Sequence, residues 1–163
     1  MKASLAVAVC LLAGSPRAQP AASAPAAASV YDEKADAHAE LDAALRRAAA
    51  EGKRVLVDFG ANWCGDCLAL DRNFHRPENQ ALLATDFVLV HVEIGRFDKN
   101  TDIAKRYGVP LNKGVPAVVV LDGKGRVVYA QKKGEFESMR SMDPSSVNAF
   151  LNKWKALKTA KTS

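Results

Sequence analysis

The feature that most restricts the possible folds of this chain is an apolar segment that leads into a pair of cysteines. Residues 54–60 read RVLVDFG, and their apolar side chains are consecutive rather than alternating, which predicts a strand buried on both faces. Cys64 and Cys67 follow this strand, and residues 62–74 predict a helix. A strand that is covered on both faces and followed by a helix is typical of an α/β domain.

The rest of the chain continues this succession of helices and strands. Residues 87–94 (FVLVHVEI) predict a second buried strand, and residues 117–131 predict two strands that form a hairpin around Asp122-Gly123. Four further helices are indicated by helical spacing or by capping residues, at residues 32–52, 78–84, 100–108 and 144–157. We therefore expect one domain with a mixed central sheet of about four strands, flanked by helices and preceded by an extra N-terminal helix.

Both ends of the chain lie outside the predicted domain, which covers residues 32–158. Lys2 and the short apolar run at 4–14 are typical of a secretory signal peptide rather than a membrane anchor. We expect cleavage after Ala18, with alternative sites up to Ala28. The segments outside the domain are a signal peptide at 1–18, an Ala/Pro/Ser-rich flexible linker at 19–31 and a tail at 159–163.

The signal peptide predicts an exported protein, most simply a periplasmic one, although secretion fits as well. No stable membrane insertion is expected after cleavage, and we expect a monomer. The formal net charge is +5, but the basic residues are scattered and form no stripe with interleaved aromatic residues, so nucleic acid is not an expected partner. Cys10 lies within the predicted signal peptide, so the mature chain keeps only Cys64 and Cys67.

A C-x-x-C pair at the junction of a strand and a helix favours redox chemistry. Cys64 would lie at the N-terminus of the helix, where free N–H groups and the helix dipole stabilise a thiolate, the form that attacks a disulfide. Cys67 lies one turn further on, where it can attack the resulting mixed disulfide and release the reduced substrate. Trp63, just before the pair, would shield the site and present an apolar surface to a partner.

Two cysteines also allow other interpretations. A C-x-x-C pair can supply two of the four ligands of a zinc site. Here His75 and His91 would have to supply the other two, because no second C-x-x-C is present. Attachment of haem is excluded, since Leu68 rather than histidine follows Cys67. The alternatives to an oxidoreductase are a metal-binding or redox-sensing module without turnover, and a binding or chaperone domain. We expect no metal and no cofactor.

The segment VLVDFGANWCGDC (55–67) resembles the thioredoxin superfamily in its apolar strand, its acid, its tryptophan and its cysteine pair. KGVPA (113–117) is similar to the cis-proline loop of that family, and the hairpin and final helix follow in the family's order. The resemblance covers roughly residues 32–157. It implies a thioredoxin fold and a thiol–disulfide oxidoreductase, which acts on protein disulfides and on an electron donor or acceptor. The signal peptide adds the expectation that this oxidoreductase is exported.

The resemblance also implies roles for individual residues. Asp58 would be a buried carboxylate that relays a proton near Cys67. Pro116 would follow a cis peptide bond and face the cysteines, and Val115 would pair with an extended substrate through its backbone. His91 stands where many members carry a lysine near the buried acid, although a half-buried core histidine is the simpler interpretation.

Gly65 and Asp66 separate the two cysteines, and thioredoxins usually have proline where Asp66 stands. A carboxylate in the first turn favours the helix, but it also repels the thiolate at the same helix end. We therefore expect Gly65 and Asp66 to tune the reduction potential of the Cys64–Cys67 couple and to keep it nearer the value of a reductant. The alternative is that Asp66 points into water and only helps the helix to begin.

Overall fold

The computed structural model describes residues 29–156. The predicted signal peptide, the tail at 159–163 and most of the linker lie outside the described residues. The domain combines one mixed sheet with helices on both of its faces, so the predicted thioredoxin fold is confirmed.

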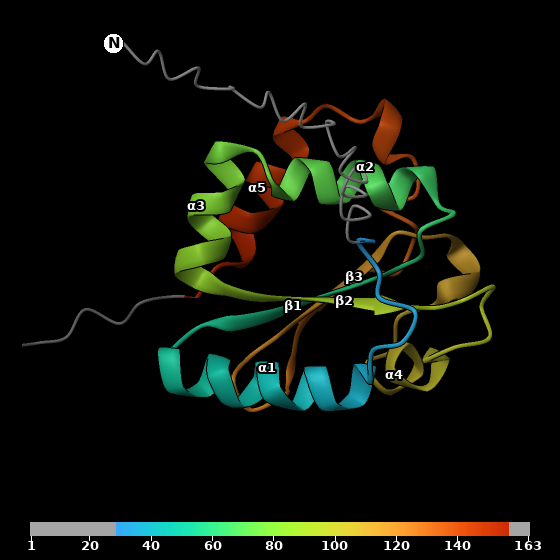
Figure 1. The fold of residues 1–163 in the computed structure, drawn as a ribbon. Helices are drawn as coiled ribbons and strands as arrows, with labels where there is room; N and C mark the ends of the chain where they lie inside the picture. The colour runs from blue at the N-terminus through green and yellow to red at the C-terminus, as the bar shows by residue number, and fades with distance from the viewer. Residues whose placement is uncertain (1–28, 157–163) are drawn as a thin grey trace, which may run out of the picture.

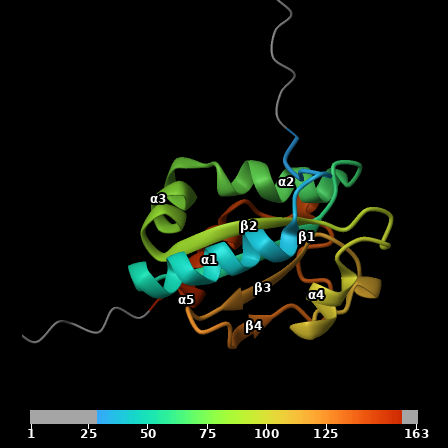
Figure 2. The same cartoon turned by 60° about the horizontal axis from the view of Figure 1, so that its bottom comes forward.

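Four strands form the sheet, in the order β2-β1-β3-β4, and Figure 2 shows them in this order. β1 pairs in parallel with β2 and antiparallel with β3, and β3 pairs antiparallel with β4. The strands are β1 (Arg54–Gly60), β2 (Phe87–Glu93), β3 (Ala117–Leu121) and β4 (Val127–Ala130).

The helices form two layers (Figure 1). α1 and α4 pack on one face of the sheet, and α2, α3 and α5 pack on the other. Among residues 29–156, no helix is both long enough and apolar enough to cross a membrane. The helices are α1 (Ala37–Glu51), α2 (Gly65–Phe74), α3 (Pro77–Asp86), α4 (Thr101–Arg106) and α5 (Ser145–Trp154), with short 3₁₀ helices at Leu111–Lys113 and Met139–Ser141.

β1 is buried on both faces because it is a central strand between two layers of helices. Val57 and Phe59 belong to the core on the side of α1, whereas Leu56 belongs to the core on the side of α2. Side chains alternate along a strand, so Asp58 faces the α2 layer with Leu56. His91 of β2 is the register partner of Asp58. The parallel pairing therefore sets an acid and a histidine side by side beneath α2.

Two helices, α1 and α2, start several residues later than the sequence predicts because a capping residue delays them. Cys64 keeps an extended backbone (φ −89°, ψ 105°) and caps α2, which therefore begins at Gly65 instead of residue 62. α1 begins at Ala37 because the Asp36 side chain accepts a hydrogen bond from the Ala39 N–H group. α5 begins at Ser145, one residue after the predicted start at Pro144, and the Asp143 side chain accepts a hydrogen bond from the Ser145 N–H group.

The predicted hairpin is present, but its turn is longer than the dipeptide Asp122-Gly123. β3 ends at Leu121 and β4 begins at Val127. The Asp122 carboxylate accepts hydrogen bonds from two N–H groups of the loop, those of Lys124 and Arg126. The left-handed position is Gly125 (φ 77°), so the side chain of Asp122 organises a wider loop.

Tyr31, the last residue of the expected linker, is fully buried. Asn62 holds its backbone at two points: the Tyr31 N–H group donates to Asn62 Oδ1 (3.1 Å), and Asn62 Nδ2 donates to the Tyr31 carbonyl (2.7 Å). The ring packs against Gly60, where an added Cβ would lie 2.4 Å from the tyrosine Oη. The folded part of the chain therefore includes Tyr31, ahead of α1.

We predict that Gly60→Ala destabilises the protein, because its methyl group would displace the Tyr31 ring. Overpacking of this kind costs about 1–3 kcal/mol of unfolding free energy, measured by urea denaturation. The cost should largely disappear in a Tyr31→Leu background, which removes the atoms that collide. Gly65→Ala is the control, because its added Cβ would meet Arg140 at an ordinary 3.4 Å. Equal costs of Gly60→Ala in both backgrounds would contradict this explanation.

Candidate active site

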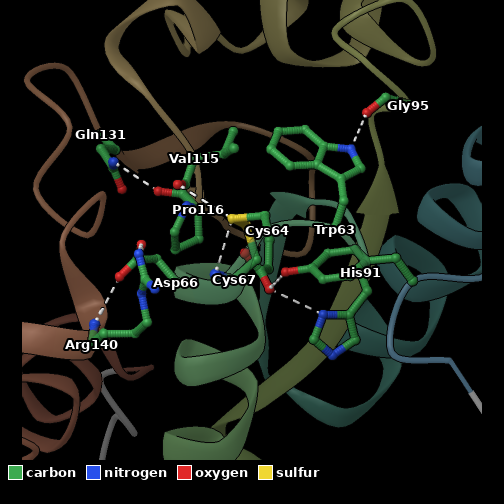
Figure 3. The surroundings of a disulfide bond; sticks show 12 residues. Trp63, Cys64, Asp66, Cys67, His91, Gly95, Val115, Pro116, Gln131 and Arg140 are labelled. Atoms are coloured by element: carbon green, nitrogen blue, oxygen red, sulfur yellow. Dashed lines mark hydrogen bonds and ion pairs between the residues drawn. A yellow bond between two sulfur atoms is a disulfide. The ribbon is translucent and has the colours of Figure 1, made fainter.

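The two cysteines form a disulfide at the N-terminus of α2 (Figure 3). Cys64 is the N-cap, and its Sγ accepts a hydrogen bond from the Cys67 N–H group at 3.1 Å. Cys64 is 6% exposed and Cys67 is fully buried. A thiolate on Cys64 would keep this charge-assisted bond and would face the positive end of the helix dipole. A partner can therefore reach Cys64 before it reaches Cys67.

The loop that carries Val115 and Pro116 lies against the cysteine pair. The Val115–Pro116 peptide bond is cis, and the Val115 carbonyl oxygen lies 3.6 Å from Cys64 Sγ. The buried side chain of Gln131 holds the loop: its Nε2 donates to the Pro116 carbonyl, and its Oε1 accepts from the Val118 N–H group. Sequence reasoning missed Gln131, whose only signal is that a polar residue directly follows β4.

An exposed aromatic surface borders the disulfide. Trp63 is 44% and Phe97 is 46% exposed, and their rings pack at 5.9 Å between centroids. The Trp63 Nε1–H group donates to the Gly95 carbonyl, and the Arg96 guanidinium lies over the indole ring. A groove of about 790 Å³ continues from Phe97 toward the cis-proline loop. Its lining is formed mainly by Phe97, Lys105, Val109, Pro110, Leu111 and Gly114.

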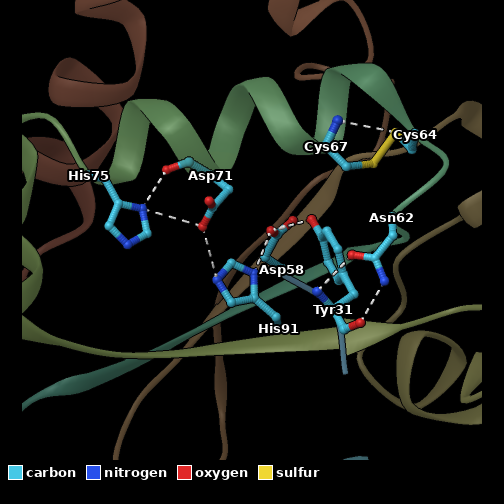
Figure 4. Close-up of polar contacts among 8 residues, drawn as sticks. All are labelled: Tyr31, Asp58, Asn62, Cys64, Cys67, Asp71, His75 and His91. Atoms are coloured by element: carbon cyan, nitrogen blue, oxygen red, sulfur yellow. Dashed lines mark hydrogen bonds and ion pairs between the residues drawn. A yellow bond between two sulfur atoms is a disulfide. The ribbon is translucent and has the colours of Figure 1, made fainter. Parts of the chain in front are cut away.

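The buried carboxylate of Asp58 is the centre of a polar network under α2 (Figure 4). Its Oδ2 accepts a hydrogen bond from the Tyr31 hydroxyl (2.7 Å) and lies 3.1 Å from His91 Nδ1. The other ring nitrogen of His91, Nε2, lies 3.4 Å from Asp71 Oδ1. The network therefore runs from the buried acid, through the histidine, to an acid on α2 whose side chain is 13% exposed.

Burial and charge act on the titratable groups of this network. Burial and the Asp58 carboxylate raise the pKa of Tyr31 far above its ordinary value, so its hydroxyl stays protonated and donates. Burial alone would lower the pKa of His91. The hydrogen bond to Asp58 and the charges of Asp58 and Asp71 outweigh burial, so the pKa of His91 is raised.

His91 is thus more than a half-buried core histidine, since both ring nitrogens face carboxylates. Sequence reasoning missed two of its neighbours, Tyr31 and Asp71. Asp71 follows Cys67 by one helical turn on the same face of α2, and that spacing was a usable signal. No signal in the sequence marked Tyr31, because it ends a segment of low complexity.

Asp66 does not stand alone beside the cysteines, as the sequence analysis assumed, and neither does it simply point into water. Its Oδ1 accepts from the Arg140 N–H group (2.8 Å), and its Oδ2 lies 3.0 Å from Arg140 Nη2. Its side chain is only 15% exposed. Burial raises the pKa of Asp66, but the bonds from Arg140 outweigh it and lower the pKa. Arg140 lies 74 residues away in the short 3₁₀ helix Met139–Ser141, and nothing in the sequence linked the two.

The remaining histidines lie at the edge of the network or away from it. His75 is largely exposed and contacts Asp71, and His38 pairs with Asp102. Within the part of the chain that the structure describes, no group of three or more His, Cys, Asp and Glu side chains is arranged to hold a metal ion. The candidate zinc ligands His75 and His91 therefore do not gather around the cysteines.

Comparisons with known proteins agree with this geometry. A family model described as thioredoxin-like matches residues 36–123. A solved disulphide isomerase from Xylella fastidiosa is 40% identical, with a TM-score of 0.75, and the match covers 78% of this chain and 98% of that one. A thioredoxin from Thermus thermophilus is 25% identical, with a TM-score of 0.52, and covers 69% of this chain and 81% of that one. The thiol:disulfide interchange protein DsbD of Pseudomonas fluorescens is 30% identical over 125 residues, which are 76% of this chain but only 19% of DsbD.

We predict that Cys67→Ser accumulates mixed disulfides through Cys64, because the accessible thiolate attacks and the resolving thiol is missing. The adducts can be counted by mass spectrometry after incubation with a disulfide-bonded protein. Cys64→Ser is the matched control and should trap almost none. Trapping by Cys64→Ser but not by Cys67→Ser would reverse the two roles.

Proposed function

The chain belongs to the thioredoxin-like family, and on this premise we propose that it is a thiol–disulfide oxidoreductase that reduces protein disulfides. The observation that carries the proposal is the Cys64–Cys67 disulfide at the N-terminus of α2, which faces the Val115–Pro116 loop and lies above the Asp58 network. A nucleophile, a resolving thiol, a backbone that can dock a substrate and a buried acid are thereby brought together.

In the proposed reaction, the Cys64 thiolate attacks one sulfur of a substrate disulfide and expels the other as a thiolate. Cys67 then attacks the sulfur of Cys64, forms the intramolecular disulfide and releases the second substrate sulfur. Asp58 takes the proton that Cys67 must lose before this attack. An electron donor finally returns the pair to the dithiol.

The surface around the pair supports a polypeptide substrate. The backbone of Val115 lies close enough to Cys64 Sγ to pair with an extended chain whose own sulfur is bound there. Trp63 and Phe97 offer exposed aromatic contact beside it, and the groove beyond Phe97 has room for apolar side chains. These contacts favour protein disulfides over small disulfides such as oxidised glutathione.

The charges near Cys64 support the reducing direction. Strong oxidants of this superfamily stabilise the thiolate of the reduced form. Here Asp66, between the two cysteines, forms an ion pair with Arg140, so the charges of these two residues largely cancel. Among residues 29–156, no ion pair or hydrogen bond brings a cation to Cys64. Only the helix N-terminus then favours the thiolate, which leaves the couple nearer a reductant's potential.

The proposed setting is outside the cytoplasm, in the periplasm or beyond it. This rests on the signal-like residues 1–18, which lie outside the described residues. In an oxidising compartment a reducing pair needs a supply of electrons, so the partners are proteins with disulfides and a separate dithiol donor.

We predict that the purified protein catalyses reduction of a disulfide-bonded protein by dithiothreitol, and that Cys64→Ser abolishes this activity. The measurement is the rate of disulfide loss, with and without added zinc. Full function in Cys64→Ser would indicate a binding or chaperone domain. Tight zinc binding without turnover would indicate the metal-binding alternative.

We also predict that Arg140→Gln makes the couple more reducing, because it leaves the Asp66 charge unpaired near the Cys64 thiolate. Across about 7 Å, the repulsion amounts to roughly 0.6–2.4 kcal/mol. This corresponds to a reduction potential about 10–50 mV more negative at pH values where the thiolate is populated. Arg126→Gln is the matched control, since Arg126 pairs with Asp122 in the distant hairpin loop. An unchanged potential in Arg140→Gln would remove Asp66 from redox tuning.

A further inference from the structure

The two oxygens of the Asp58 carboxylate have different surroundings. Oδ2 accepts from the Tyr31 hydroxyl and faces His91 Nδ1. Oδ1 is buried and has no hydrogen-bond partner within residues 29–156. A buried carboxylate oxygen without a partner is costly, and a proton would relieve that cost. Oδ1 is therefore the oxygen that is available to hold a proton, and in the proposed function that proton comes from Cys67.

Such an exchange changes the charge of a site that is closed to water. Asp58 is fully buried, so a charge that appears or disappears there without compensation is expensive. The inference below rests on the proposed function, in which Cys67 gives its proton to Asp58 in one half of the cycle and takes it back in the other.

We propose that His91 compensates this charge: it releases a proton from Nε2 when Asp58 gains one, and takes a proton back when Asp58 loses it. The geometry suits this exchange, because Nδ1 faces the fully buried Asp58 and Nε2 faces Asp71, whose side chain keeps 13% of its surface exposed. With Nδ1 protonated in both states, the contact with Asp58 never breaks. The buried pair then alternates between carboxylate with imidazolium and carboxylic acid with neutral imidazole.

The surroundings of His91 favour its charged form only while Asp58 is ionised. The Tyr31 ring packs edge-on against the imidazole at 5.2 Å and stays neutral. The His91 side chain is 20% exposed, and His91 lines a hollow of about 440 Å³ whose charged lining residues are Asp32, Glu40 and Arg47. Arg47 forms an ion pair with Glu51, which offsets its positive charge. The raised pKa of His91 agrees with this, and protonation of Asp58 removes its largest source.

Proton transfer and disulfide exchange are coupled in the step that resolves the mixed disulfide. The Cys67 S–H proton moves to Asp58 Oδ1, and the proton on His91 Nε2 passes through Asp71 to water. The Cys67 thiolate attacks Cys64 Sγ, the bond between Cys64 and the substrate sulfur breaks, and the Cys64–Cys67 bond forms. The substrate leaves as a thiolate and takes a proton from water. When the electron donor reopens the disulfide, Cys67 leaves as a thiolate, Asp58 returns its proton, and His91 is protonated again from solvent.

The first test separates the two chemical steps in a single turnover. Reduced protein is mixed with a fluorophore-labelled peptide disulfide, and the mixed disulfide is followed as it forms and as it resolves. His91→Gln keeps a polar group near Asp58 but cannot carry a charge. Resolution should slow by roughly 100-fold, and its pH profile should move to higher pH because the Asp58 carboxylate loses its counter-charge. Attack by Cys64 should not change.

His38→Gln is the matched control, because His38 is an exposed histidine paired with Asp102 on the far side of the sheet. It should alter neither step. If the wild-type protein does not resolve the mixed disulfide at all, the proposed function fails. If the wild-type protein resolves it and His91→Gln does so at the same rate and with the same pH profile, the proposed function stands and charge compensation by His91 is overturned.

The second test does not depend on activity or on the stability of His91→Gln. The titration of His91 can be followed by NMR in the wild-type protein and in Asp58→Asn, which imitates the neutral acid. The pKa of His91 should be lower in Asp58→Asn, and Nδ1 should remain the protonated nitrogen of the neutral ring. Equal pKa values in the two proteins, or protonation on Nε2 instead, would overturn the proposal.

Discussion

The burial of one carboxylate, that of Asp58, is the constraint on which the rest of this structure depends. A carboxylate in a central strand is tolerated only if its surroundings supply donors and a counter-charge. Tyr31 supplies a donor from the segment before α1, and His91 supplies a partner from the neighbouring strand. The parallel register of β1 and β2 sets that partner opposite, and the absence of a side chain at Gly60 makes room for the tyrosine. Several parts of the fold are thus arranged around a single acid.

The parts of the molecule that follow from local patterns could be predicted from the sequence. The uninterrupted apolar run of β1 indicated a central strand, and the cysteine spacing placed Cys64 at a helix start, as observed. Where a single side chain decided a boundary, the expectation was less accurate. Cys64 caps α2 from outside the helix, and Asp122 widens the hairpin loop.

The contacts that sequence reasoning missed join segments that only the tertiary structure brings together. Arg140 reaches Asp66 from a short 3₁₀ helix before α5, and Tyr31 reaches Asp58 from a stretch that resembles a linker. Neither belongs to a periodic pattern, so no local signal marked them. Asp71 was different, because one helical turn separates it from Cys67. The sequence shows the spacing of Asp71 from Cys67. It does not show that His91 is the partner of Asp71, because His91 is brought under α2 by the register of β1 and β2.

The hydrogen bonds between Tyr31 and Asn62 also decide where a tag, a linker or a second domain can be fused to this protein. The described chain enters the domain at the edge of the redox site, because Asn62 lies only two residues before Cys64. The other end is different: the Trp154 carbonyl accepts from Arg54, at the opposite end of β1 from the cysteines. An affinity tag, a surface linker or a fused domain at residue 30 would crowd the approach of a substrate. The same addition after α5 would leave that approach open, which makes the C-terminal side the suitable point of immobilisation.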